Sequence, residues 1–117
     1  MLIDLIGAYS DIVLLPHVVA ETSSLVRQIR NPIRHQIQVT FNNLITSTVE
    51  YPIASAYGAQ RDEVSELGIT DSVILHFLSL DEISPTLMTI DSSLLNRASV
   101  LGYSVVDCRS RFWPEKP

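Results

Sequence analysis

Cysteine and basic residues are scarce in this chain of 117 residues. The single cysteine, Cys108, excludes an internal disulfide, and we expect a reducing, cytoplasmic setting. Eight Lys and Arg residues stand against thirteen Asp and Glu residues, which gives a formal net charge of −5. This balance excludes a passive, sequence-independent nucleic-acid coat, because such a protein needs a basic surface. It leaves open an acidic metal site that cleaves nucleic acid.

Long hydrophobic runs and glycine-rich loops are also missing. No apolar run approaches the roughly 18 residues of a transmembrane helix, and residues 1–4 lack the positive start of a signal peptide. The four glycines form no phosphate-binding pattern, and the three histidines have neither zinc-ligand spacing nor a cysteine partner. With 46% hydrophobic and 18% charged residues, the chain is expected to fold as one domain over residues 1–117, with a C-terminal tail at 107–117.

Short apolar segments alternate with amphipathic ones along the chain. The alternation predicts an α/β fold of three layers, α/β/α, in which helices cover both faces of a central parallel sheet. The expected strands span 12–15, 48–51, 87–90 and 103–106. The expected helices span 2–9, 16 to about 31, 32–45, a short stretch after 52, 71–79 and 92–101. Residues 68–70 lead into the helix at 71–79, and Gly102 ends the last helix.

The apolar stripes of the second and third expected helices predict which side chains face the core. These are Val18, Thr22, Leu25 and Ile29 in the helix after Pro16, and Ile33, Ile37, Phe41 and Leu44 in the helix after it.

Three acidic residues lie where a parallel sheet presents its ligand-binding edge. Glu21 lies early in the helix after the first strand, at the edge of that helix's apolar stripe. Asp71 opens a helix, and the residues three, four and seven positions later are apolar. Asp91 directly follows the strand that ends at residue 90. Ligands bind at the carboxyl ends of parallel strands, and a buried carboxylate is costly unless it is paired, hydrogen-bonded or metal-bound.

Each acid also has a purely structural interpretation. Asp71 can stabilise a helix N-terminus with Thr70 as the cap, Asp91 can cap the helix that begins at Ser92, and Glu21 can be a surface residue. All three are nevertheless expected at the same edge of one sheet, after separate strands. Three carboxylates that converge there suit Mg²⁺ or Mn²⁺, and such an ion can activate water for phosphodiester cleavage.

The same residues carry a resemblance to the PIN-domain nucleases. Residues 12–22 (IVLLPHVVAET) resemble a strand and helix of that family, in which a glutamate falls five residues after a proline. Residues 67–74 (LGITDSVI) resemble the family's G-x-x-D helix start, and residues 87–95 (LMTIDSSLL) resemble its T-x-D strand end. The resemblance covers residues 2–106 and implies a three-layer α/β fold.

This resemblance also implies a function. It implies a metal-dependent endoribonuclease, often the toxin of a toxin–antitoxin pair, whose partners are RNA, an antitoxin protein and a second copy of the same chain. Glu21, Asp71 and Asp91 are implied to hold Mg²⁺ or Mn²⁺ and to position the attacking water. Thr89 is implied to support these ligands or to contact the substrate.

The chain departs from the family pattern at its start. PIN domains begin with a central strand that ends in the first of four acids, and no such strand precedes residues 2–9. Asp4 lies 17 residues before Glu21, fewer than a strand and crossover need, and it is expected to face away from the apolar stripe. We therefore expect an internal start within a longer protein or a truncated relative. Unpaired backbone groups would make such a form marginally stable or self-associating.

Two other functions stay open. The first is a catalytically inactive PIN-like remnant that acts as a binding or dimerisation module, because one acid of four is missing. The second is a receiver-like or nucleotide-binding α/β domain, which the lack of a glycine-rich phosphate loop disfavours. Arg27, Arg30 and Arg34 have helical spacing and indicate either a solvated helix face or a contact with RNA.

Overall fold

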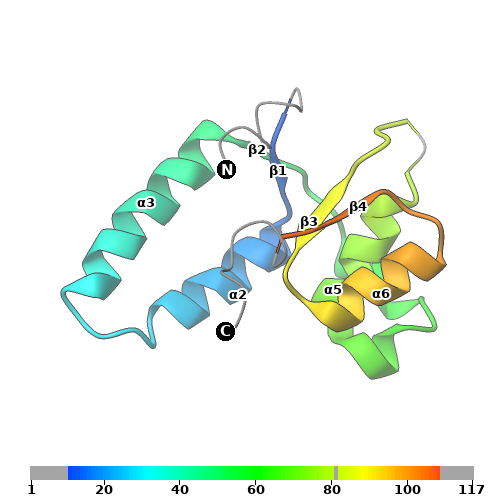
Figure 1. Cartoon of the computed structure of the whole chain (residues 1–117), viewed down its shortest axis with the longest axis horizontal. Helices are drawn as coiled ribbons and strands as arrows, with labels where there is room; N and C mark the ends of the chain where they lie inside the picture. Colours follow the sequence, from blue (N-terminus) through cyan, green and yellow to red (C-terminus); the bar gives the residue numbers. More distant parts are fainter. Residues whose placement is uncertain (1–10, 81, 109–117) are drawn as a thin grey trace, which may run out of the picture. The chain divides into compact units, whose positions relative to one another are not determined.

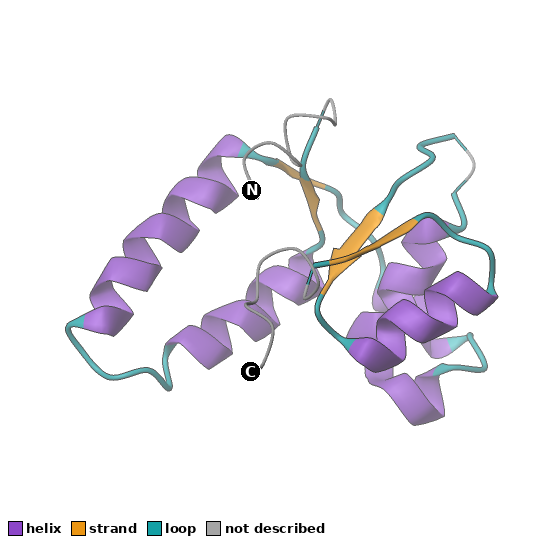
Figure 2. Cartoon of the chain, viewed as in Figure 1, coloured by secondary structure: helices purple, strands orange, loops and turns teal. Residues whose placement is uncertain are grey.

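The computed structural model describes residues 11–80 and 82–108. Within them the chain divides into two compact units, with the boundary between Ile53 and Ala54. Each unit contains helices and one pair of short parallel strands (Figures 1 and 2). The helix expected at 2–9 lies outside the described residues. No described helix combines the length and the apolar character that crossing a membrane requires.

The first unit is a pair of helices attached to a two-stranded parallel sheet. Its elements are β1 (Val13–Leu14), α2 (Pro16–Val26), α3 (Ile33–Ser47) and β2 (Val49–Glu50). Pro16 occupies the first turn of α2, where its missing N–H is not needed. Val13 pairs with Val49, and Leu14 pairs with Glu50.

The expected burial of the two helical stripes in this unit is wrong at several positions. Leu25 is 62% exposed, while its neighbour Val26 is buried. No residue of α3 is buried, and Ile33, Ile37 and Leu44 are all exposed. The apolar period correctly predicts an amphipathic helix, but it cannot show that the chain supplies a surface to cover the apolar face.

The second unit holds the hydrophobic core cluster. Its elements are α4 (Ser55–Ala59), α5 (Val64–Leu78), β3 (Leu87–Thr89), α6 (Ser92–Val100) and β4 (Val105–Asp107). Strands β3 and β4 are parallel, with Leu87 opposite Val105 and Thr89 opposite Asp107. The core joins α5 to α6 through Leu75, Leu78, Leu94 and Ala98, and partly buried side chains of β3 and β4 pack against it.

Glycines shape this unit at two points. Gly58 lets α4 approach α5 closely, since a Cβ there would lie 2.7 Å from Val73 Cγ2. Gly68 has a φ of +86° and interrupts α5, so the helix begins again just before Asp71. Gly102, also at positive φ, ends α6 as the sequence predicts.

The fold class is confirmed at the level of mixed α/β structure with parallel strand pairs. All four expected strands occur, and α4, α5 and α6 lie close to their expected positions. The described strands form two separate pairs, β1–β2 and β3–β4, and not one continuous sheet. Helix α5 spans Val64–Leu78, but the non-helical backbone of Gly68 divides it into two helical segments, and the second segment begins close to the expected helix start.

Candidate functional site

Asp91 is held firmly at the junction of β3 and α6. Its Oδ1 accepts hydrogen bonds from the backbone N–H of Ser93 at 2.9 Å and of Leu94 at 3.1 Å, so it caps α6. The Asp91 N–H donates to Thr89 Oγ1 at 3.0 Å. The structural interpretation of Asp91 as a helix cap is therefore confirmed. The other carboxylate oxygen, Oδ2, takes no part in these bonds, and the side chain is exposed.

Asp107 is a second carboxylate at the same edge of the β3–β4 pair. It ends β4 in register with Thr89, and the N–H of Cys108 donates to the Thr89 carbonyl at 3.0 Å. Residues in register on parallel strands point to the same face of the sheet. The sequence reasoning missed Asp107, although it follows the apolar strand residues Val105 and Val106 just as Asp91 follows a strand.

Asp71 lies in the first turn of α5 after the kink at Gly68. It is half-buried, and its neighbours Ser72 and Val73 are fully buried. The partial burial of Asp71 agrees with its expected position beside the apolar face of the helix. It also places the negative charge close to the beginning of a helical segment, where the helix dipole favours an anion.

Glu21 lies in the other unit, in the second turn of α2, and its side chain is exposed. The structure therefore places Asp71 and Asp91 in one unit and Glu21 in the other. In the described part of the chain, no group of three or more His, Cys, Asp or Glu side chains is arranged to hold a metal ion. The convergence of the three acids remains a prediction from the sequence.

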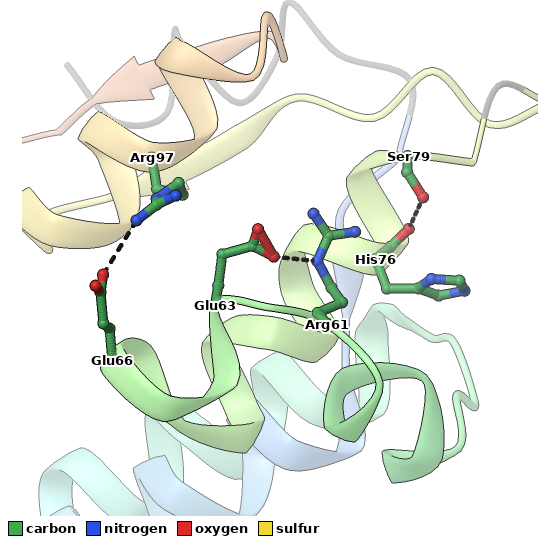
Figure 3. Close-up of polar contacts among 6 residues, drawn as sticks. All are labelled: Arg61, Glu63, Glu66, His76, Ser79 and Arg97. Atoms are coloured by element: carbon green, nitrogen blue, oxygen red, sulfur yellow. Dashed lines mark hydrogen bonds and ion pairs between the residues drawn. The ribbon is translucent and has the colours of Figure 1, made fainter.

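Two ion pairs lie at the N-terminal end of α5 (Figure 3). Arg61 Nε donates to Glu63 Oε1 at 2.7 Å, and Glu63 is only 8% exposed. The Arg61 hydrogen bond holds the pKa of the Glu63 carboxyl below its ordinary value of 4.5, although burial acts in the opposite direction. Arg97 of α6 pairs with Glu66 of α5 at 3.1 Å on the exposed surface. Arg97 therefore has an intramolecular partner, which the sequence did not reveal.

An aromatic pair joins α4 to α5. The rings of Tyr57 and His76 stack with centroids 4.4 Å apart and an interplanar angle of 11°. Ser79 Oγ donates to the backbone carbonyl of His76, near the end of α5 (Figure 3). This pair has no sequence signal, because the two residues lie on different helices.

No family model, no curated protein and no solved structure matches the chain.

Proposed function

We propose that this protein is a PIN-like, metal-dependent endoribonuclease that cleaves RNA phosphodiesters. The observation that carries the proposal is the arrangement of Thr89 and Asp91 at the carboxyl end of β3. The α6 backbone orients Asp91 through Oδ1, and Thr89 holds the backbone that leads into it. A ligand position at this end of a parallel strand is the usual one in α/β folds.

The carboxylates have the chemistry that such an enzyme needs. Asp91 and Glu21 are exposed and Asp71 is half-buried, and carboxylate oxygens are the ligands that a hard divalent cation prefers. In the proposed site, Glu21, Asp71 and Asp91 hold Mg²⁺ or Mn²⁺. Bound there, the ion activates water and stabilises charge during phosphodiester cleavage.

Other parts of the second unit support substrate binding in this proposal. The helical segment that restarts after Gly68 presents backbone N–H groups at its N-terminal end, whereas the N–H groups of Ser93 and Leu94 at the start of α6 already donate to Asp91 Oδ1. A helix start of the first kind favours phosphate oxygens. Asp107 adds negative charge beside Thr89, which favours a cation over direct approach of an RNA phosphate.

A toxin role, with an antitoxin protein as partner, belongs to the same proposal and rests on the resemblance to PIN domains. The alternative is a catalytically inactive PIN-like module for binding or dimerisation. The exposed apolar residues of α3 are the observation that favours this alternative.

A metal titration separates the two functions. The protein is titrated with Mn²⁺ and Mg²⁺, and its melting temperature is followed. A ligand that binds only the folded state at about 100 times its Kd stabilises the protein by about 2.7 kcal/mol. The nuclease proposal predicts a saturable rise that Asp71→Asn reduces and Asp62→Asn, an exposed control, retains. An unchanged melting temperature at millimolar metal favours the inactive module.

A further inference from the structure

The exposed face of α3 has the geometry of a helix-pairing seam. Ile33, Ile37, Thr40 and Leu44 follow one another at intervals of four, three and four residues, the spacing of core positions in a coiled coil. Ile33 is 57%, Ile37 37% and Leu44 39% exposed. A shallow apolar groove runs along the same helix and is lined by Gln36, Ile37, Thr40, Phe41 and Leu44.

This seam lies on a helix that has partly buried side chains, among them Phe41 and Ile45, but no fully buried one. Helix α3 contains 15 residues, and none of them is buried. Isolated helices of about 12–15 residues are marginal in water, because most helix stability in proteins comes from packing of the apolar face. A surface that covers the seam would therefore stabilise the first unit as well as remove apolar area from water.

The charges of α3 favour a second copy of the same chain as the covering surface. Residues 35–49 contain no Asp, Glu, Lys or Arg, so two such helices can pack together without repulsion between like charges. Arg34 lies in the first turn, and Glu50 follows the last. An antiparallel pair places the basic start of one helix beside the end of the other, where the helix dipole is negative. A parallel pair would place the two Arg34 side chains together.

We propose that α3 pairs with α3 of a second copy in an antiparallel homodimer. The seam is self-complementary in this direction because its four-three-four spacing reads the same from both ends. Ile33 then faces Leu44 of the partner subunit, and Ile37 faces Thr40 of the partner subunit. To the second copy that the PIN resemblance implies, the proposal adds the surface and the direction of pairing, and it does not depend on the nuclease function.

The first test compares two substitutions on opposite sides of α3. Light scattering should give twice the 13.0 kDa chain mass for the wild-type protein. Ile37→Glu should weaken the dimer by roughly tenfold or more. Val39→Glu, an equally apolar and exposed position off the seam, should leave the dimerisation constant within about threefold. Circular dichroism shows whether each variant keeps its helices.

The second test gives the direction of pairing without disrupting the helix by a charge. In the antiparallel pair, the two copies of residue 33 lie about 16 Å apart along the helices, beyond disulfide reach. The double variant Ile33→Cys, Leu44→Cys should therefore cross-link between chains on oxidation, and Ile33→Cys alone should not. Cys108 is buried and present in both proteins.

Three results would overturn the proposal. The first is a wild-type chain that stays monomeric, including one whose α3 instead binds a helix of another protein. The second is a folded Ile37→Glu variant that dimerises as well as the wild type. The third is efficient cross-linking of Ile33→Cys alone, which would require a parallel pair.

Discussion

Arg61 Nε lies 2.7 Å from Glu63 Oε1, within the short connection between α4 and α5, and the Glu63 side chain is nearly buried. The contact links two residues only two positions apart, so it fixes the turn that leads into α5. The contact therefore stabilises the first segment of α5, which Gly68 separates from the segment that carries Asp71.

Acid should weaken the protein through Glu63. Its pKa in the folded state lies below 4.5, so the ion pair contributes stability that is fully present above that value. This contribution is lost as the pH falls through 4.5 toward the folded-state pKa. Glu63→Gln should remove that part of the pH dependence and lower stability near neutral pH by about 1–3 kcal/mol. Urea unfolding between pH 3 and 7 measures both effects.

The exposed pair between Arg97 and Glu66 provides the matched control. Glu66→Gln should change stability by no more than about 1 kcal/mol, since exposed ion pairs contribute little. If Glu63→Gln and Glu66→Gln lowered the free energy of unfolding equally, burial would not be what makes the Arg61–Glu63 pair the stronger one.

Removing the hydroxyl of Ser72 should stabilise the protein. Ser72 is fully buried, and within the described residues its Oγ has no hydrogen-bond partner. An unsatisfied buried polar group costs about 1–3 kcal/mol, so Ser72→Ala should raise the free energy of unfolding by about 1 kcal/mol. Ser65→Ala, exposed on the same helix, gives the gain from helix propensity alone. A Ser72→Ala protein less stable than Ser65→Ala would show that the hydroxyl has a partner.

A methyl group at Gly58 should destabilise the contact between α4 and α5. The added Cβ would lie 2.7 Å from Val73 Cγ2, 3.0 Å from Val73 N and 3.1 Å from Ile69 O. Overpacking of this kind costs about 1–3 kcal/mol, which exceeds the gain of about 0.5–1 kcal/mol from replacing a helical glycine. Gly58→Ala should therefore lower the melting temperature.

A double-mutant cycle with Val73→Ala tests the cause of that loss. Val73→Ala removes Cγ2, so Gly58→Ala should cost less in this background than in the wild type. Additive losses would show that the valine methyl is not the obstacle.

Substitutions at Asp91 should separate its structural role from its proposed metal ligation. Asp91→Ala should cost about 1 kcal/mol of stability through loss of the α6 cap, whereas Asp91→Asn should retain the cap. Both should lose metal-dependent stabilisation. Retention of full Mn²⁺ stabilisation by Asp91→Asn would limit Asp91 to capping.

The sequence predicted those parts of the molecule that depend on local signals. Gly102 ends α6, Asp91 caps it, and the four short apolar segments become strands, because each follows from neighbouring residues. The predicted burial of Ile33, Ile37 and Leu44 on α3 was wrong, because an apolar stripe does not specify which surface covers it. The pairs of Arg61 with Glu63 and of Tyr57 with His76 were missed. Both depend on how the chain turns between α4 and α5.

The most direct test of the proposed function is cleavage of a labelled single-stranded RNA by the purified full chain. The account predicts cleavage that starts on addition of Mg²⁺ or Mn²⁺ and stops with a chelator. Asp71→Asn and Asp91→Asn should abolish it, and Asp62→Asn should leave it unchanged. Absence of cleavage by a folded, metal-saturated wild-type protein would contradict the nuclease function. Unchanged cleavage by Asp71→Asn would contradict the assigned site.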